Sequence, residues 1–411
     1  MSGVSIENAA EVLRPPAGGL PYLRGDRAGE LVLDGGALAL DGDRIAGFEP
    51  DATASARFDA TGCTVLPGFV DCHTHLPFAG WRAEEYELKV TGVPYEEIAR
   101  RGGGIASSAR AFGAASDEEV LDQARGLSAE MLRAGTTTFE GKTGYGLSVF
   151  AERRAARLGR ELGVEAVQTM TLTGLFAHSV PEGYTADAWM DEAEALARSA
   201  DVDALDIYVE SVAFANEHLE RLGRVAREVG LPLRAHVEQF AENRSVPVAL
   251  DAGARSVDHL ACLHPDDLGP LAASETAAVL LPGAEFLGAE RVAPARALAD
   301  AGAICVLGTD LNPGTSPVSS IPVVIGLAVR RYGWSVREAL AACTLNGAYV
   351  LGLADEVGSL EAGKRADVIV LDAPAAHLPY RFGRNPVCAV FAGGRPVWVR
   401  PDNAWRLTGG V

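Results

Sequence analysis

The stretch VLPGFVDCHTH, residues 65–75, decides how the rest of the chain is read. It is an apolar, strand-like run that only Pro67 and Gly68 interrupt, and it ends in two of the eight histidines of the chain. His73 and His75 are two residues apart, so on an extended strand their side chains point to the same side. Two surface histidines in a loop are the alternative, but the apolar context favours half of a metal site.

The bulk composition is that of a globular enzyme. The chain has 411 residues, enough for one large domain and a smaller one, with 48% hydrophobic and 22% charged residues. A formal net charge of −19 would repel a phosphate backbone, so nucleic acid is not an expected partner. The six cysteines form no CxxC pair, which favours reduced thiols in a cytoplasmic protein. Residues 1–19 lack the segments of a signal peptide, and no apolar run reaches the ~18 residues of a membrane span, so no membrane association is expected.

Apolar runs alternate with amphipathic, helix-like stretches through the middle of the chain. Several of these stretches are followed by Gly just before the next run, as helix C-termini often are. Eight such units predict an α/β protein with a parallel (β/α)8 barrel resembling a TIM barrel. The runs cover residues 64–70, 136–140, 165–173, 204–210, 231–237, 255–259, 276–281 and 303–309.

The sequence pattern at both ends of the chain differs from that of the middle. They consist of short β-like pieces separated by Gly, Pro and Asp. We therefore expect a small discontinuous β-sandwich domain formed by residues 1–62 and 355–411, with the barrel at residues 63–354. The first barrel unit carries an insertion, residues 78–116. Its glycine run, Gly102–Gly104, suggests either a mobile loop over the site or a plain surface loop.

Histidines and carboxylates gather at the predicted strand ends, where barrels of this type carry their chemistry. His236 ends the fifth strand and Asp310 follows the eighth. With His73 and His75 they supply three imidazoles and one carboxylate. That set suits Zn²⁺, and also Fe²⁺ or Mn²⁺, with a position left for water.

The predicted ligand set indicates hydrolytic chemistry. A divalent ion lowers the pKa of a bound water to about 7 and polarises a carbonyl. Asp310 lies beside that water and is a candidate base for its proton. His259 is expected behind the ligands, where it would hold the water or the oxyanion. The alternative for His259 is a core histidine paired with Asp258.

Three features resemble the amidohydrolase superfamily of metal-dependent hydrolases. They are VLPGFVDCHTH, the Asp after the eighth strand, and GSLEAGKRADVIVLD at residues 358–372. The resemblance covers nearly the whole chain and implies a distorted barrel with a small β-sandwich built from both termini. It also implies that the four candidate ligands bind a metal ion. Two-metal members bridge their ions with a carboxylated lysine on strand four, but residues 204–210 contain none and Lys142 lies on strand two, so a single ion is expected.

Further motifs lie along the chain: residues 79–105, EGKTGYGL at 140–147, AHSVP at 177–181, HVEQ at 236–239 and TDLNPGTSP at 309–317. Together these motifs resemble one branch of that superfamily. The resemblance implies hydrolytic opening of a flat cyclic amide, 4-imidazolone-5-propanoate, to N-formimidoyl-L-glutamate in histidine degradation. It also implies Zn²⁺ or Fe²⁺ as the ion and a homodimer as the assembly.

The same resemblance assigns the substrate-binding residues. A carboxylate tail suits Arg82, whose guanidinium is a two-pronged donor. A tyrosine between two glycines, Tyr145, can approach a planar ring. The residues that the resemblance places on the substrate or product are Arg82, Tyr145, His178, Gln239, Asn312, Gly314 and Thr315.

The proton donor stays open at the level of sequence. Related deaminases use a His-x-x-Glu on strand five, but here that fourth position is Gln239 and the acid, Glu238, precedes it. A neutral glutamine cannot shuttle a proton, which argues against a deaminase and leaves Glu238, His259 and Asp310 as candidates. The alternative functions are hydrolysis of another small cyclic amide, deamination and, least favoured because all four ligands are present, a non-catalytic scaffold.

Overall fold

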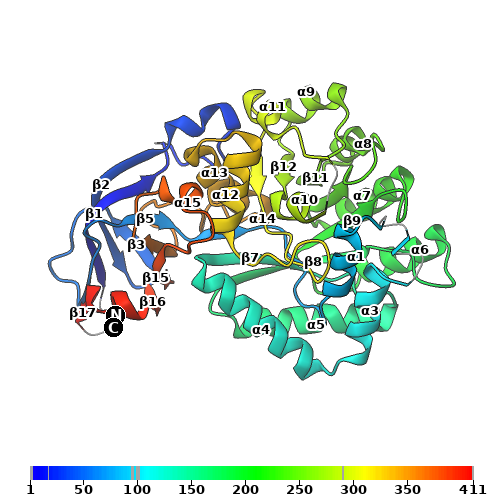
Figure 1. Ribbon diagram of the computed structural model, residues 1–411, viewed down its shortest axis with the longest axis horizontal. Coiled ribbons are helices and arrows are strands. Elements are labelled where there is room, and N and C mark those ends of the chain that lie inside the picture. Colours follow the sequence, from blue (N-terminus) through cyan, green and yellow to red (C-terminus); the bar gives the residue numbers. More distant parts are fainter. Residues whose placement is uncertain (1–2, 17, 94–96, 99–101, 289–290, 410–411) are drawn as a thin grey trace.

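Two sheets organise the chain in the computed structural model. A parallel sheet ringed by helices lies beside a mixed sheet built from both ends of the chain (Figure 1). The predicted TIM-like barrel with a small β-domain from both termini is therefore confirmed. None of the helices in the described part of the chain is long and apolar enough to cross a membrane. The structure describes residues 3–16, 18–93, 97–98, 102–288 and 291–409; parts of the predicted motif at 79–105 lie outside the described residues.

The barrel strands follow one another around the parallel sheet in chain order. The ring closes beyond the first and last strands, where the His75 N–H donates to the Leu311 carbonyl and the Asp310 N–H donates to the His73 carbonyl, both at 2.9 Å. Closure therefore places the two ends that carry candidate ligands side by side. Within the described residues the strands are β6 (Phe69–Asp71), β7 (Thr136–Lys142), β8 (Thr169–Ala177), β9 (Ala204–Val209), β10 (Leu233–Val237), β11 (Ser256–His259), β12 (Ala277–Leu280) and β13 (Cys305–Leu307).

The predicted first strand, residues 64–70, is in fact two strands in different sheets. β5 (Thr64–Pro67) pairs with strands of the mixed sheet, and only β6 belongs to the barrel. The chain passes between the sheets at Gly68, where a Cβ atom would lie 2.0 Å from the Thr137 hydroxyl oxygen. Pro67 has no N–H to continue a ladder, and Gly68 permits the close approach, so the interruption in the apolar run marks the crossing.

The third predicted strand begins later than its apolar run suggested. Residues 165–173 were expected, but α5 continues to Glu165 and β8 starts at Thr169. Gly163 was read as the residue after a helix; it stays inside α5, and its backbone is not left-handed. Gly230 and Gly253, by contrast, end their helices with φ of 72° and 75°, as predicted.

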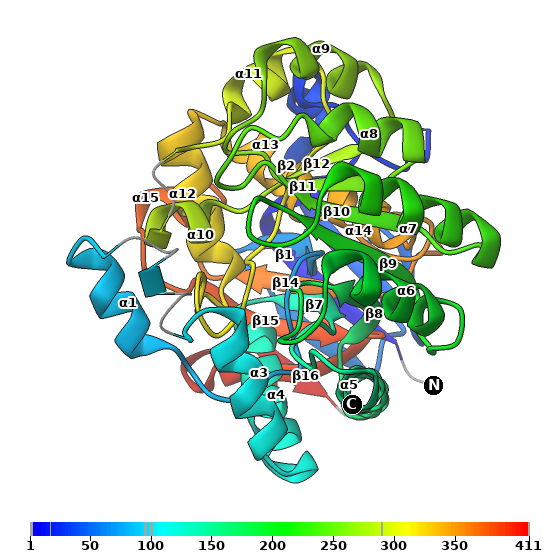
Figure 2. The same cartoon turned by 90° about the vertical axis from the view of Figure 1, so that its right-hand side faces the viewer.

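Helices cover the outside of the barrel (Figure 2). The predicted helices at residues 117–134, 150–162, 186–200, 215–229 and 293–301 correspond to α4 (Asp117–Arg133), α5 (Val149–Glu165), α6 (Ala186–Ala197), α7 (Asn216–Val229) and α11 (Ala295–Asp300). A capping box between Ser116 and Glu119 starts α4. The other α-helices within the described residues are α1 (Ala83–Val90), α3 (Ile105–Ala114), α8 (Ser245–Ala252), α9 (Pro265–Ala273), α10 (Pro282–Gly288), α12 (Ile321–Tyr332), α13 (Val336–Ala342), α14 (Leu345–Leu351) and α15 (His377–Tyr380).

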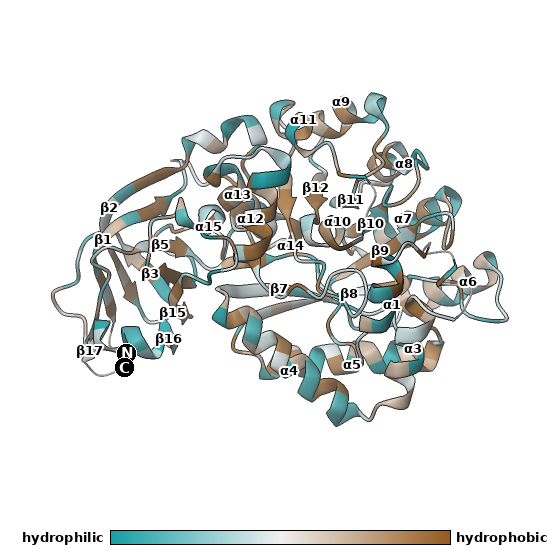
Figure 3. Cartoon of the chain, in the orientation of Figure 1, coloured by the Kyte–Doolittle hydropathy of each residue, from teal (hydrophilic) through white to brown (hydrophobic). Residues whose placement is uncertain are grey.

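The mixed sheet is built around β1 (Val4–Arg14), which the sequence analysis did not identify as a strand. β1 pairs antiparallel with β2 and parallel with β4 and β5. Apolar residues concentrate in its strands and in the barrel strands (Figure 3). The exact domain boundaries stay a prediction. The other strands of this sheet are β2 (Val32–Asp41), β3 (Arg44–Gly47), β4 (Ala56–Asp59), β14 (Val368–Leu371), β15 (Val387–Ala392), β16 (Arg395–Val399) and β17 (Leu407–Gly409).

Substitution of Gly68 tests the crossing between the sheets. We expect Gly68→Ala to lower the free energy of unfolding by about 1–3 kcal/mol, because the new methyl group overpacks against Thr137. Gly126→Ala in α4 is the control: its Cβ would meet nothing within 4 Å, and alanine should stabilise the helix by roughly 0.5–1 kcal/mol. Urea unfolding of both variants measures the difference. An unchanged midpoint for Gly68→Ala would contradict the tight crossing.

Candidate active site

Three buried histidines and one aspartate meet at the carboxyl end of the barrel. The donor atoms of His73, His75 and His236 lie within 4.8 Å of one another. Asp310 completes the group, with its Oδ1 at 3.4 Å from His73 Nε2 and 3.3 Å from His75 Nε2. Among the described residues, no hydrogen-bond partner faces His73 Nε2, His236 Nε2 or Asp310 Oδ2. Buried polar atoms without partners are what a cation would satisfy, so the donor set fits a divalent metal ion.

Two further carboxylates hold the histidine rings from behind. His73 Nδ1 lies 2.6 Å from Asp258 Oδ2, and His236 Nδ1 lies 3.1 Å from Asp206 Oδ1. Each contact turns the opposite ring nitrogen, Nε2, toward the centre, as carboxylates behind metal-bound histidines do. Asp258 thus pairs with His73 and not with His259, which corrects the alternative considered from the sequence. The sequence analysis missed Asp206, whose signal was a lone acid inside an otherwise apolar strand.

Burial shapes the protonation of the candidate ligands. It lowers the pKa of His75 to about 4 and also lowers the pKa of His236, so both rings are neutral near pH 7. Burial opposes protonation of His73 as well, but Asp258 and Asp310 raise the pKa of that ring. Although burial disfavours a charged Asp310, the nearby rings of His73 and His75 hold its pKa well below the usual value. The centre therefore offers an ionised carboxylate and, at His75 and His236, imidazole lone pairs, which metal binding requires.

Several residues at the strand ends have a backbone conformation that side chains rarely adopt. Glu238, His259 and Asp310 have φ of 54°, 81° and 54°. Such positions cost about 1–3 kcal/mol each and cluster at functional sites. All three follow or end barrel strands beside the candidate ligands, so the backbone independently marks this end of the barrel as functional. No sequence pattern revealed these conformations.

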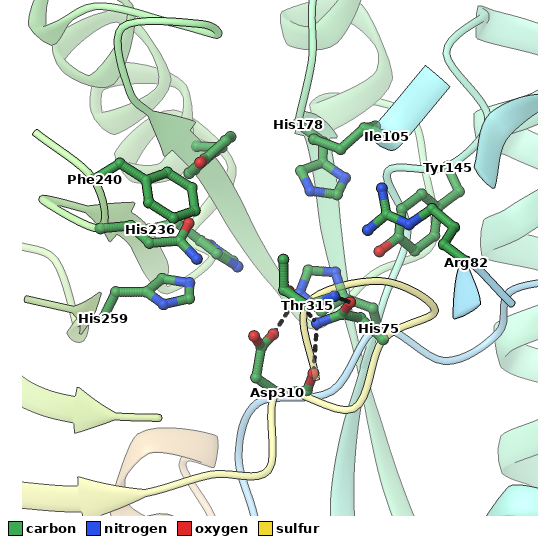
Figure 4. A pocket seen from close by; sticks show the side chains of 13 residues that line it. His75, Arg82, Ile105, Tyr145, His178, His236, Phe240, His259, Asp310 and Thr315 are labelled. Atoms are coloured by element: carbon green, nitrogen blue, oxygen red, sulfur yellow. Dashed lines mark hydrogen bonds and ion pairs between the residues drawn. The ribbon is translucent and has the colours of Figure 1, made fainter. Parts of the chain in front are cut away.

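A pocket of about 410 Å³, including its open mouth, lies over the histidine cluster. His236, His259 and Phe240 stand on one side, and Arg82, Tyr145 and Ile105 on the other (Figure 4). The complete lining is His75, Arg82, Ile105, Tyr145, His178, Tyr208, His236, Gln239, Phe240, His259, Asp310, Asn312 and Thr315.

Arg82 enters this pocket as a buried cation just before α1. It is 8% exposed, and among the described residues its Nε and Nη1 have no hydrogen-bond partner. The carboxylate of Glu85 lies 3.8 Å from Nη1. A Cβ atom on Gly314 would lie 1.5 Å from Arg82 Nη2, so only glycine leaves room for the guanidinium. Arg82 is thus poised to receive an anionic group, and Gly314 acts by its lack of a side chain.

The loops after β7 and β8 hold Tyr145 and His178 over the cluster. The His178 Nδ1–H donates to the Gly144 carbonyl at 3.0 Å, which leaves Nε2 as an acceptor. Burial holds the pKa of His178 well below its usual value, so the ring is neutral. It stacks on His75 with ring centroids 5.4 Å apart, and Tyr145 meets it edge-on at 5.2 Å. These rings form an aromatic wall of the pocket.

Asn312 organises the loop that follows Asp310. Its side-chain oxygen accepts hydrogen bonds from the N–H groups of Gly314 and Thr315, at 2.8 and 2.7 Å. Its Nδ2 donates to the Asp310 carbonyl and to the Thr315 hydroxyl, at 2.7 and 2.8 Å. Asn312 and Thr315 both line the pocket, and the amide of Asn312 fixes the shape of the rim.

The three candidate proton carriers lie in different places. Asp310 and His259 line the pocket, and burial lowers the pKa of His259 to about 3. Glu238 is not among the lining residues: its Oε1 accepts from the Ser245 N–H at 3.0 Å, at the start of α8. Gln239, the next residue, does line the pocket. The structure therefore brings all predicted site residues together except Glu238, with Gly314 acting at the rim.

Three lining residues were missed by the sequence analysis. Ile105 starts α3, Phe240 lies in the loop after β10, and Tyr208 lies near the end of β9. Ile105 directly follows the glycine run, so the insertion in the first barrel unit reaches the pocket. Motion of that insertion stays a prediction.

Comparison with known proteins identifies the class. The sequence model of the Amidohydrolase family matches residues 64–399. The fold is similar to those of a triazine hydrolase variant (TM-score 0.74, 16% identity, 98% of this chain and 97% of that one) and of a guanine deaminase from C. acetobutylicum (TM-score 0.70, 14% identity, 96% and 100%). The chain belongs to the amidohydrolase family.

Sequence relatives narrow the class further. The chain is 43% identical to an imidazolonepropionase from Rubrobacter xylanophilus, covering 96% of this chain and 99% of the relative. It is 40% identical to one from Methylobacterium nodulans, over 89% and 94% of the two chains, and 37% identical to one from Porphyromonas gingivalis, over 90% and 89%. Within the amidohydrolases, the chain belongs with the imidazolonepropionases, which confirms the predicted resemblance.

The carboxylate behind His73 allows a test of the metal centre. We expect Asp258→Asn to weaken binding of a divalent ion by about 10- to 100-fold, because the His73 ring loses the partner that orients it. Asp267→Asn, a buried acid paired with Arg244 away from the centre, is the control and should keep the affinity. Chelator competition measures both. Equal affinities in the two variants would rule out the orienting role of Asp258.

Proposed function

We propose that this chain hydrolyses 4-imidazolone-5-propanoate to N-formimidoyl-L-glutamate. The observation that carries the proposal is the juxtaposition, in one pocket, of the His73–His75–His236–Asp310 cluster and the buried guanidinium of Arg82. The substrate has the matching pair of features, a ring carbonyl to be attacked and a carboxylate tail. The imidazolonepropionase relatives support the same reaction.

The pocket residues suggest how the substrate would lie. Arg82 would bind the propionate carboxylate through its buried guanidinium, a charge-assisted and bidentate contact. The planar ring would lie against Tyr145 and His178, with Gln239 and Thr315 near its polar edge. This orientation directs the ring carbonyl toward Asp310 at the bottom of the pocket. Fixing both ends of a small molecule supplies the alignment that hydrolysis needs.

The chemistry follows from the protonation states of the lining residues. A divalent ion held by the three histidines and Asp310 would acidify a water molecule and polarise the ring carbonyl. Asp310 is ionised, so a carboxylate oxygen that does not bind the ion can accept one proton of the attacking water. The water oxygen bonds to the carbonyl carbon, the bond between that carbon and its ring nitrogen breaks, and Asp310 passes the proton to that nitrogen. The second proton of the water leaves the new carboxyl group for solvent, so a carboxylate forms. His259, neutral and at the pocket wall, would hold the oxyanion.

Deamination and a scaffold role are less well supported. The acid that could serve a deaminase, Glu238, has its Oε1 bonded at the start of α8, and its neighbour in the pocket is the neutral Gln239. A scaffold would not need to keep a complete ligand set with carboxylates behind two of its histidines. We further propose one ion per chain, Zn²⁺ or Fe²⁺, and a cytoplasmic homodimer.

A direct assay tests the proposed reaction. Purified protein is given freshly generated 4-imidazolone-5-propanoate, and the loss of its ultraviolet absorbance is followed with and without a chelator. We expect rapid loss with formation of N-formimidoyl-L-glutamate, abolished by the chelator and by Asp310→Asn. If turnover of the substrate continued at the same rate in the presence of the chelator, the metal-dependent mechanism would be contradicted. If the protein carries metal but does not hydrolyse this compound, the result would indicate that its substrate is another cyclic amide.

The role of Arg82 has its own expected outcome. Arg82→Ala should raise KM by about 10- to 100-fold with a smaller effect on kcat, since a hydrogen bond to a charged group contributes about 1.5–3 kcal/mol. Arg82→Lys should lie between, because lysine keeps the charge without the bidentate geometry. Arg157→Ala on the outer face of α5, where the side chain is 55% exposed, is the control. An unchanged KM in Arg82→Ala would place the carboxylate elsewhere.

A further inference from the structure

A lysine lies fully buried in the barrel directly beneath the metal ligands. Lys142 ends β7 with no exposed side-chain surface, and its Nζ lies 2.8 Å from Glu140 Oε2 and 2.7 Å from Asp206 Oδ2. Glu140 in turn pairs with Arg234, which is also buried. A lysine is almost never buried without a specific partner, and this one has two.

This ammonium group is part of the metal centre and not a separate feature. The second oxygen of Asp206, Oδ1, holds the ring of His236 at 3.1 Å. Atoms of Asp206, His236 and Asp258 lie within 4.8 Å of one another, which is a second group with the spacing of metal ligands. The Lys142 ammonium, bound to Asp206, supplies a positive charge at that group.

The charges of this network leave room for one divalent ion. The connected set holds four carboxylates, those of Glu140, Asp206, Asp258 and Asp310, and two basic side chains, Lys142 and Arg234. A histidine must be neutral to bind a metal ion, so with the ligands in place one divalent ion makes the set neutral. A second ion beside Lys142 would leave two excess positive charges in a buried site, and uncompensated buried charge is costly.

We propose that the Lys142 ammonium is a built-in second cation of this centre. It takes the place that a second divalent ion would need, limits the protein to one ion, and through Asp206 keeps His236 turned toward that ion. Lys142 is thus a positioning residue. The inference rests on the metal centre of the proposed function but not on the substrate, and ion counting tests it without turnover.

Two variants separate this role from a general contribution to barrel stability. Lys142→Ala removes the charge and opens space between Glu140 and Asp206, so we expect it to bind two divalent ions per chain. Lys142→Met removes the charge but fills the space, so it should still bind one ion per chain, because the methionine side chain leaves a second ion no room. A purely structural lysine predicts lower stability in both variants and one ion in each.

Mn²⁺ provides the probe for the experiment. Chains stripped by a chelator are loaded with Mn²⁺, desalted and analysed for metal, and their paramagnetic resonance spectra are recorded. We expect one ion per chain and an isolated Mn²⁺ signal for the unaltered chain, and two ions with a spin-coupled signal for Lys142→Ala. Lys364→Met is the control: this lysine is 12% exposed and paired with Glu361 in another part of the chain, and its loss should change neither quantity.

Three results would overturn the proposal. The first is two tightly bound ions in the unaltered chain, and the second is a folded Lys142→Ala variant that saturates at one ion. The third is a Lys142→Met variant that binds two ions. Circular dichroism reports folding, and if Lys142→Ala does not fold, the ion counts of the unaltered chain and of Lys142→Met still decide the question. If the ion counts are as expected but the protein does not hydrolyse 4-imidazolone-5-propanoate, the proposed substrate is wrong and the role of Lys142 stands.

Discussion

Compensation of buried charge is the constraint on which this structure depends. The barrel interior holds carboxylates that are nearly inaccessible to water, and each must find a positive partner or a hydrogen-bond donor. Arg234 and Lys142 supply part of that charge from within the chain. The remaining deficit lies at Asp310 and the histidine nitrogens that face it. The protein is therefore built to gain a divalent ion, and metal affinity and barrel stability are coupled properties.

Closure of the barrel brings together the groups that lack a positive partner, Asp310 and the histidine nitrogens that face it. The ligands come from the segment after β6, from β10 and from the segment after β13, which are far apart in the chain and meet only when the ring of strands is complete. Asp71 helps to hold the joint, because its carboxylate accepts hydrogen bonds from the Thr309 hydroxyl at 2.6 Å and from the Thr309 N–H at 3.0 Å. The mixed sheet begins on the other side of Gly68. One apolar run thus ties the small sheet to the metal centre.

The four candidate metal ligands could be identified from the sequence alone, but the residues that support them could not. Apolar runs locate strand ends, and His-x-His has a spacing that reveals its geometry. Asp206 and Lys142, in contrast, lie in strands many residues apart, and no local pattern says which partner each will meet. The crossing at Gly68 and the continuation of α5 through Gly163 were missed because a glycine is compatible with a turn, a helix and a close contact. β1 was missed because polar residues interrupt its apolar pattern, and Asn8 has a φ of 61° where the register shifts. Tertiary contacts decide such cases.

The metal ligands and the residues at the pocket rim have separate roles, which explains how one fold can act on different substrates. Solved structures with this fold include a triazine hydrolase variant and a guanine deaminase, so the barrel alone does not select the reaction. Here the candidate metal ligands lie in or just after barrel strands, whereas Arg82, Gly314 and Ile105 belong to the segments over the rim. A rim residue such as Arg82 can be exchanged without disturbing the charge balance beneath it, but Lys142 cannot. Substrate preference is therefore free to change at the rim, while the ion count is set by the core.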